Sequence, residues 1–280
     1  MKITHDIHAH THRSLCALEC ATIANYVKSA SELGITTIGI ADHMWDEKIP
    51  FPESFRHCQS ADPTGESVIN WYRAQSIPHC RTVLEEIREQ EDLKGIHFLS
   101  GGEVEYAPGL GAAITMEEAE KLDFIIVPNS HTHITMDAAL YKPYEKHGDF
   151  MVRAIMEICS APTAQFVTSI AHPFCPVCCT YPAEYVIDAI PERLFREAFS
   201  AAKETGIAAE INSSVLAEVD PDQFRNHWMY YVMGIAKDCG CRFTFGSDSH
   251  SDTEQYSLRK GEIFAQLLGL TEDDLHPLVR

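Results

Sequence analysis

The stretch Ile3-Thr4-His5-Asp6-Ile7-His8-Ala9-His10 is strand-like and ends in two histidines. Six more strand-like stretches follow it, at residues 36–41, 96–103, 124–128, 166–171, 207–211 and 243–246. Side chains that can bind or orient a metal ion stand at or just beyond the seven ends: His8, His10, His43, Glu103, His131, His172, Glu210, Asn212, Asp248 and His250. The downstream ends of parallel strands meet at one face of a barrel, so this pattern predicts a multinuclear metal site.

Helical stretches separate the strand-like ones, at residues 21–33, 69–90, 150–159, 191–205 and 223–239. Alternation of this kind favours βα units and a largely parallel sheet. At 280 residues and 45% hydrophobic content, the chain can bury one large core. We therefore predict a single α/β domain over 1–280, with a loop insertion at 44–68, where Pro50, Pro52, Pro63 and Gly65 interrupt any periodicity.

Composition narrows the choice of partners and compartment. The formal net charge of −19 disfavours binding to nucleic acid or to anionic lipid. No stretch resembles a secretion signal or reaches the length of a membrane span, so we expect a cytoplasmic protein without membrane contacts. In that compartment the ten cysteines are expected to be thiols. The sequence gives no expectation for the oligomeric state.

Two short segments carry the clearest coordination chemistry. In His8-Ala9-His10, side-chain alternation along a strand places both imidazoles on one side. In Gly246-Ser247-Asp248-Ser249-His250, a carboxylate and an imidazole follow the last strand, a donor mixture typical of hydrolytic Zn, Mn or Fe centres. Glu103 has two carboxylate oxygens and could join two ions. Taken singly, each residue is equally compatible with an ordinary hydrogen-bonded turn or strand end.

Taken together, the motifs resemble the PHP (polymerase and histidinol phosphatase) family of metal-dependent phosphoesterases. The resemblance spans nearly the whole chain and rests on an ordered series: His8-Ala9-His10-Thr11, Ala41-Asp42-His43, Gly102-Glu103-Val104-Glu105-Tyr106, Ser130-His131, Ala171-His172-Pro173, Glu210-Ile211-Asn212 and Gly246 to His250. The length and the insertion after His43 look closer to the histidinol-phosphatase branch. The resemblance implies a distorted seven-stranded (β/α) barrel that holds two or three divalent ions (Zn, Mn or Fe).

The same resemblance implies how the ligands are shared. His8, His10, Glu103 and Asp248 would hold one ion, and Glu103, His131 and His172 a second. His43 and His250 would hold a third, normally completed by an Asp or His soon after the opening pair. Here that place is taken by Leu15 and Cys16. Either Cys16 supplies a thiolate, His12 or Glu19 substitutes for it, or the third site is weak or empty.

The implied activity is hydrolysis of a small phosphate monoester, possible substrates including histidinol phosphate, by metal-activated water. Glu103, Asp248 and His250 are the expected catalytic residues. Three divalent ions would bring about +6 of charge, which Glu103, Asp248 and a Cys16 thiolate reduce to about +3 to +4, so an anionic substrate fits the site. Asp42 and Asn212 are expected to orient ligands rather than to bind metal.

Three other functions stay open at this point. An amidohydrolase also opens with a His-x-His pair and closes with an Asp on a barrel, although Glu103 and His250 favour the phosphoesterase. A phosphodiesterase or nuclease is a second alternative, and a non-catalytic metal-binding domain a third. Cys175-Pro176-Val177-Cys178-Cys179 could form part of a separate structural metal site, but thiols without metal are the simpler interpretation.

Overall fold

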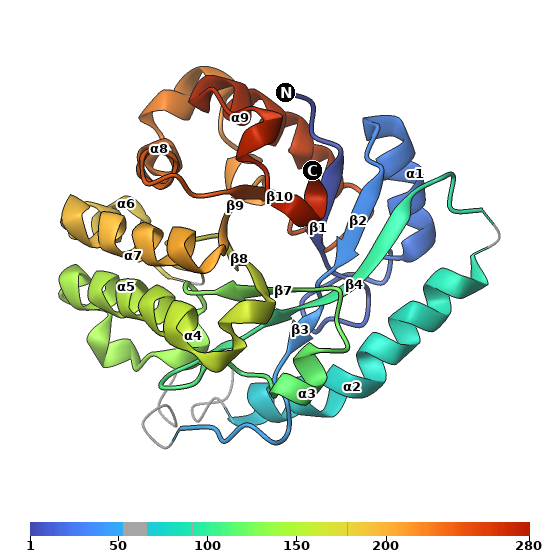
Figure 1. Ribbon diagram of the computed structural model, residues 1–280, viewed down its shortest axis with the longest axis horizontal. Helices are drawn as coiled ribbons and strands as arrows, with labels where there is room; N and C mark the ends of the chain where they lie inside the picture. Colours follow the sequence, from blue (N-terminus) through green and yellow to red (C-terminus); the bar gives the residue numbers. More distant parts are fainter. Residues whose placement is uncertain (53–65, 91, 178) are drawn as a thin grey trace.

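The computed structural model describes residues 1–52, 66–90, 92–177 and 179–280. It is a nearly closed barrel of seven parallel strands, with helices around it (Figure 1). The barrel strands are β1 His5–Ala9, β2 Thr37–Ile40, β4 His97–Val104, β7 Phe124–Pro128, β8 Val167–Ala171, β9 Ala208–Asn212 and β10 Phe243–Gly246. The short β3 His43–Met44 pairs with β4, and β5 Tyr106–Ala107 and β6 Gly111–Ala112 form a separate antiparallel pair. The distorted seven-stranded (β/α) barrel expected from the sequence is confirmed.

The helices form the outer layer of the barrel (Figure 1). They are α1 Ile23–Leu33, α2 Glu66–Glu89, α3 Met116–Ala119, α4 Thr132–Thr135, α5 Tyr144–Ser160, α6 Glu184–Ile187, α7 Glu192–Thr205, α8 Trp228–Asp238 and α9 Leu258–Leu268. Helix α1 ends where its sequence predicts, because Gly34 closes it with φ of 75°, and it begins at Ile23 rather than at residue 21, because Thr22 is its cap and accepts a hydrogen bond from Asn25 N. None of these described helices has the length and apolar composition needed to cross a bilayer.

Strand order fixes which strand ends become neighbours. The barrel strands run β1-β2-β4-β7-β8-β9-β10, and the short β3 extends β2 by pairing with β4 through His43 and Glu103. The circle closes between β1 and the segment after β10, where Asp248 N donates to His8 O at 2.7 Å and His10 N to Ser249 O at 2.9 Å. The two ends of the chain that carry ligands are therefore joined by backbone hydrogen bonds.

A compact apolar layer fills the barrel below these strand ends. Its members are Ile7, Ala41, Leu99, Phe124, Ile126, Ala171 and Val279. The Phe124 ring occupies the middle: a Cβ added to Gly101 on the next strand would lie 2.3 Å from it. The large Phe124 side chain on β7 thus requires a glycine at the facing position on β4. Side chains that fill the interior of small barrels have to fit one another in this way. This layer supports the floor on which the polar strand ends stand.

Two sequence expectations need adjustment. Helix α5 begins at Tyr144 rather than at residue 150, because its first turns are held by tertiary contacts of buried His147 with Tyr181 and Thr132. Residues 221–226 form a 3-10 helix, and α8 begins only at Trp228. The insertion expected at 44–68 falls largely on residues 53–65, which lie outside the described part of the chain.

Candidate metal centre

The expected ligands come together at the downstream end of the barrel. All nine candidates belong to groups whose donor atoms lie within 4.8 Å of one another: His8, His10, Cys16, His43, Glu103, His131, His172, Asp248 and His250. Most of them are buried, whereas Cys16 is exposed and Asp248 and His250 are partly so. A cavity of about 180 Å³ opens onto the cluster and is bordered by Cys16, Tyr72, His133 and Val177 in addition to several of the ligands.

Glu103 and Asp248 each place an oxygen near the Nε2 atoms of His8 and His10. His8 Nε2 lies 3.1 Å from His10 Nε2, 3.6 Å from Glu103 Oε2 and 3.4 Å from Asp248 Oδ1. His10 Nε2 lies 3.6 Å and 3.3 Å from the same two oxygens. Donors around a tetrahedral zinc ion at about 2.0–2.1 Å are separated by about 3.3–3.4 Å. The spacings of 3.1 to 3.4 Å among His8, His10 and Asp248 suit one divalent ion, and Glu103 Oε2 lies slightly farther, at 3.6 Å, from both imidazoles.

The other oxygen of Glu103 faces a second set of imidazoles. Glu103 Oε1 lies 3.0 Å from His172 Nε2 and 3.5 Å from His131 Nε2. A carboxylate that directs one oxygen to each of two donor sets is the arrangement expected of a ligand that bridges two ions. His43 Nδ1, by contrast, lies 3.0 Å from Oε2, the Glu103 oxygen that faces His8 and His10.

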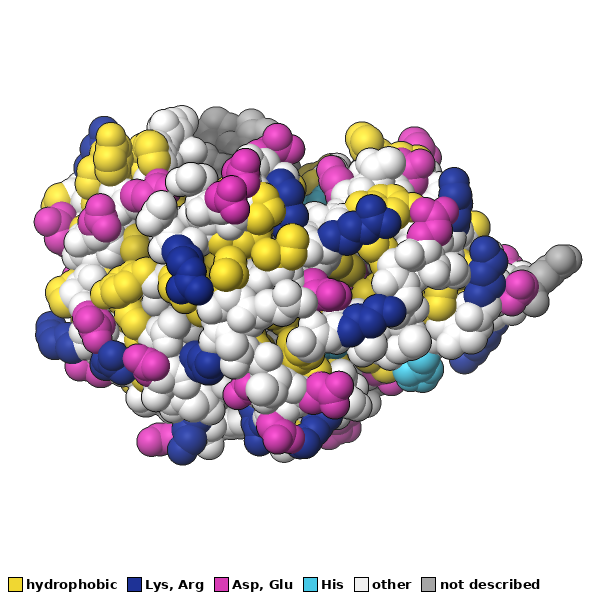
Figure 2. Space-filling view, turned by 90° about the horizontal axis from the view of Figure 1, so that it is seen from above, with side chains coloured by type: hydrophobic (Ala, Val, Ile, Leu, Met, Phe, Trp, Pro, Cys, Tyr) yellow, Lys and Arg dark blue, Asp and Glu magenta, His cyan; other side chains and the backbone are white. Residues whose placement is uncertain are grey.

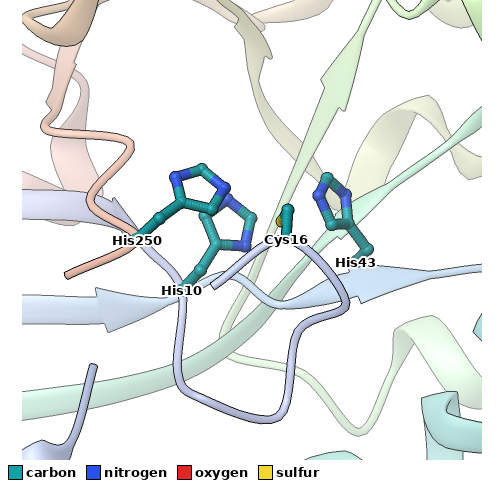
Figure 3. Close-up of side chains that lie close together, drawn as sticks. All are labelled: His10, Cys16, His43 and His250. Carbon is teal, nitrogen blue, oxygen red and sulfur yellow. The ribbon is translucent and has the colours of Figure 1, made fainter. Parts of the chain in front are cut away.

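A third group consists of His10, Cys16, His43 and His250 (Figure 3). Cys16 stands between the His250 and His43 side chains. His10 stacks on His250, with ring centroids 4.4 Å apart. Of the alternatives left open by the sequence, the structure places Cys16 beside these imidazoles, whereas neither His12 nor Glu19 joins a group of donors among the described residues.

Most of the imidazoles are oriented by a partner on the nitrogen that faces away from the centre. His8 Nδ1 donates to Glu210 at 2.7 Å and His131 Nδ1 to Glu105 at 2.9 Å. His172 Nδ1 pairs with Ser130 Oγ at 2.6 Å, and His250 Nδ1 donates to the Asp248 carbonyl at 2.7 Å. Such partners fix the tautomer that leaves Nε2 free to bind metal.

His10 is oriented through one further step. Its Nδ1 lies 3.3 Å from Ser14 Oγ, and that hydroxyl donates to Asp42 at 2.6 Å. Asp42 also accepts from the backbone and side chain of Thr11, which follows the opening pair. Asn212 Nδ2 donates to Asp248 Oδ2 at 3.2 Å and to Glu210 Oε2 at 3.3 Å. Both residues thus occupy the orienting positions expected of them.

The backbone around Glu210 is tightly constrained. His172 and Asp248 have φ values of 27° and 51°, in a region that side chains other than glycine seldom adopt. Glu210 Oε2 accepts from His172 N at 2.6 Å, which helps to hold that conformation. A Cβ on Gly246 would lie 2.1 Å from Glu210 Oε1, so only glycine allows Glu210 to reach His8. Strained backbone of this kind is concentrated at functional sites.

Acidic and basic side chains lie together in this pocket and shift one another's pKa values. Burial alone would raise the pKa of Glu103, but His131, His43 and His8 hold it well below its usual range. Burial likewise opposes charge on His8, yet Glu210, Asp248 and Glu103 together raise its pKa well above normal. Partial desolvation of the sulfur would raise the pKa of the Cys16 thiol, whereas the neighbouring His250 and His43 side chains lower it to about 7. Divalent ions compete with protons for these same nitrogens.

Two buried polar atoms at the site have unused hydrogen-bonding capacity that a bound cation could satisfy. His43 Nδ1 and Glu105 Oε1 are both buried without a hydrogen-bond partner, although they lie 3.4 Å apart. Buried polar atoms are normally satisfied, and a metal ion is one of the groups that can satisfy them. Together with the donor spacings, this makes the residues suitable for divalent ions.

Sequence reasoning missed the orienting roles of Glu105, Ser130 and Ser14, and the packing of Tyr72 on His43 at 5.2 Å between ring centroids. Glu105 could have been found, because it stands two residues after Glu103 and close to the same strand end. Glu210 was grouped with the metal-binding side chains, but it contacts His8 instead. Tyr72 could not have been found, since it comes from helix α2 and no local pattern connects it with the site.

His12 and Arg13, which follow the opening histidine pair, lie outside the ligand groups. Arg13 Nη2 donates to Glu86 at 2.5 Å, and His12 Nε2 lies 3.9 Å from the same carboxylate. In the described part of the chain, Cys175 and Cys179 join no group of three or more metal-binding side chains. Cys178 lies outside the described residues, so that segment gives no support to a second metal site.

Neither a protein-family model nor a curated protein sequence matches the chain. Among solved structures, the chain is similar to histidinol phosphate phosphatase from Lactococcus lactis, which was crystallised with zinc, L-histidinol and phosphate. The TM-score is 0.59 at 16% identity, over 96% of this chain and 94% of that one. A provisionally assigned histidinol phosphatase from Listeria monocytogenes gives a TM-score of 0.59 at 14% identity, over 89% and 96%. The chain therefore has the fold of histidinol phosphatases, which confirms, at the level of the fold, its likeness to that branch of the PHP family.

Proposed function

We propose that the protein is a metal-dependent phosphoric ester hydrolase that removes phosphate from a small monoester. The observation that carries the proposal is Glu103, whose two oxygens face separate sets of imidazole nitrogens at 3.0 to 3.6 Å. Two divalent ions joined by such a carboxylate are a common device for displacement at phosphorus. We assign His8, His10, Glu103 and Asp248 to one ion, and Glu103, His131 and His172 to the other.

Divalent ions held at this site would supply two effects. When bound, they lower the pKa of coordinated water, in some zinc enzymes to about 7, and they offset the charge of phosphate oxygens. The chain contributes orientation: Glu210, Glu105 and Ser130 hold the imidazoles that face the ions. Zinc is the first ion to test, because it is present in the Lactococcus lactis structure.

His133 is the residue we assign to substrate contact. It lines the cavity, and its Nδ1 is buried without a hydrogen-bond partner. Burial, and then the charge of His131, lower the pKa of His133 to about 4, so the ring is neutral near pH 7. A neutral imidazole can donate a hydrogen bond to a phosphate or leaving-group oxygen. Arg13, by contrast, is engaged by Glu86.

The size of the cavity and the surface charge support a small substrate. At about 180 Å³ the cavity is smaller than typical ligand pockets of about 300–1,000 Å³, which favours a small substrate. On the face shown in Figure 2, lysine and arginine side chains stand apart with acidic side chains between them, unlike the basic stripe that tracks a nucleic-acid backbone. Histidinol phosphate is the first candidate, since histidinol and phosphate are bound in the similar Lactococcus lactis protein.

The test combines metal analysis with a screen for released phosphate. The purified protein should carry two or three divalent ions and hydrolyse monoesters in a panel containing histidinol phosphate, nucleoside monophosphates, a phosphodiester and a cyclic amide. Asp248→Asn should lose metal and activity while the circular dichroism spectrum of the barrel is retained. Exposed Asp252→Asn is the matched control and should keep both. Full turnover by the Asp248 variant, or hydrolysis of the amide alone, would contradict the proposal.

A further inference from the structure

We propose that Cys16, His43 and His250 form a thiolate-containing metal position that selects zinc over ions that prefer oxygen, such as Mn²⁺ and Mg²⁺. The proposal rests on the proposed function, because it assigns the chemistry of the third ion in the same cluster. It departs from the Asp or His implied at this point by the family resemblance.

The geometry around Cys16 is that of a ligand group. The donor atoms of Cys16, His43, His250 and His10 all lie within 4.8 Å of one another. Figure 3 shows the cysteine between His250 and His43. The Nδ1 of His250 is engaged by the Asp248 carbonyl at 2.7 Å, so the nitrogen left for a metal is Nε2.

His10 cannot be counted as a full ligand of this position. Its Nδ1 is engaged by Ser14, and its Nε2 lies 3.1 Å from His8 Nε2 and 3.3 Å from Asp248 Oδ1, inside the first donor set. One imidazole nitrogen binds one ion, so His10 belongs to that set. Three protein ligands then remain here, the number typical of a site that keeps a coordination position open.

The loop that carries Cys16 is held in place on both sides. Upstream, Ser14 Oγ donates to Asp42 and Ser14 N to the Thr11 carbonyl. Downstream, Leu18 N donates to the carbonyl of His250 at 2.8 Å, which ties the loop to another member of the group. The position of Cys16 is therefore fixed by the surrounding structure, and little conformational entropy remains to be lost when it binds an ion.

The donor types give this position a different metal preference from its neighbours. Its ligands are one sulfur and two imidazole nitrogens, whereas the first set includes oxygens of Glu103 and Asp248 as well as two imidazoles. Thiolate with imidazole suits zinc, and carboxylate tolerates harder ions such as Mn²⁺. The protein would thus hold two classes of ion in one pocket, and only one class would depend on a thiol.

The first test uses the unchanged protein and needs no activity. Cys16 is exposed and Cys20 is half-buried four residues later, so both thiols can be followed by peptide mass spectrometry after reaction with iodoacetamide. Zinc added to metal-stripped, folded protein should slow alkylation of Cys16 at least about tenfold, while the reaction of Cys20 changes little. Mn²⁺ at equal concentration should protect Cys16 far less. Equal rates with and without zinc would overturn the proposal.

The second test observes the metal–sulfur bond itself. Co²⁺-substituted protein should show a thiolate-to-cobalt charge-transfer band in the near ultraviolet, and Cys16→Ser should remove it together with one ion per chain. Cys16→Asp should restore the ion without the band and shift the preference towards Mn²⁺; Cys20→Ser should behave as the unchanged protein. A band that survives in Cys16→Ser would contradict the assignment.

The two proposals can fail separately. The thiolate site alone would be refuted by three results together: Cys16→Ser keeps every ion, zinc does not slow alkylation of Cys16 in the unchanged protein, and phosphatase activity is normal. The proposed function alone would be refuted if the protein carries all its metal ions and zinc protects Cys16, yet no monoester is hydrolysed.

Discussion

His8 Nδ1 donates a hydrogen bond of 2.7 Å to Glu210 Oε1, and both side chains are fully buried although 202 residues separate them in the chain. Glu210 also accepts from His172 N at 2.6 Å. One carboxylate on strand β9 therefore contacts a ligand of each of the two ions proposed to share Glu103.

Replacing Glu210 should weaken metal binding without removing a ligand. In Glu210→Gln, His8 loses its charged acceptor and the backbone at His172 loses a partner, so we expect metal affinity to fall by about 10- to 100-fold. Isothermal titration with zinc measures the change. Glu218→Gln, at an exposed position nearby in sequence, is the control and should bind as the unchanged protein does. Unaltered affinity in Glu210→Gln would rule out an orienting role.

Replacing Glu103 should have a more severe effect, because it removes a shared ligand. Glu103→Gln is expected to lower bound metal by at least one ion per chain and kcat by at least about a hundredfold, even with excess zinc. Glu105→Gln alters the partner of His131 and the neighbour of His43 but removes no ligand assigned to either ion, so excess zinc should largely restore its activity. Metal content and phosphate release at saturating zinc separate the two variants. Equal rescue of both would show that Glu103 is not a bridge.

Acid sensitivity should arise in part from a histidine outside the metal cluster. Burial lowers the pKa of His5 to about 3, and its Nε2 accepts from Phe245 N. The folded-state pKa lies below the unfolded value of 6.5, so the folded protein binds fewer protons. This contribution to stability is present above pH 6.5 and is lost as the pH falls from 6.5 towards 3. Between pH 7 and pH 5 the loss is about 2 kcal/mol.

The measurement is urea unfolding of the metal-chelated protein at pH 7 and pH 5. His5→Gln should lose about 2 kcal/mol less on acidification than the unchanged protein does. His97→Gln is the control, because that side chain is already exposed in the folded state. A His5→Gln protein with the same pH dependence as the unchanged chain would count against this account.

Packing inside the barrel gives a prediction that is independent of metal. A Cβ on Gly101 would lie 2.3 Å from the Phe124 ring, so Gly101→Ala should lower the free energy of unfolding by about 1–3 kcal/mol. Gly234, in helix α8, has no atom within 4 Å of the same added carbon. Gly234→Ala should therefore raise stability by up to about 1 kcal/mol through helix propensity. Thermal denaturation that gave both variants the same sign would contradict this packing.

The sequence predicted the strands of the fold and the residues of the site to different extents. Strands β7 and β10 begin and end where the sequence indicates, because buried parallel strands are short apolar runs with sharp ends. The sequence expected His8, His10, Glu103 and Asp248 to share one ion, whereas the structure groups the donors of His8, His10 and Asp248 and places Glu103 in groups with His172 and with His131. The contact of His43 with Glu103 was not expected, because it depends on the short β3 pairing with β4 after a break in β2.

What the sequence determined by itself was the alternation of strands and helices and the residue type at each strand end, since both are written in local periodicity and composition. Only the tertiary structure decided which nitrogen of each imidazole faces the centre, which oxygen of Glu103 faces which set, and that Cys16 reaches His43 and His250. These choices depend on contacts between segments distant in sequence, such as Glu210 with His8 and Leu18 with His250. Local sequence carries no information about which residue, distant in the chain, will contact a given side chain.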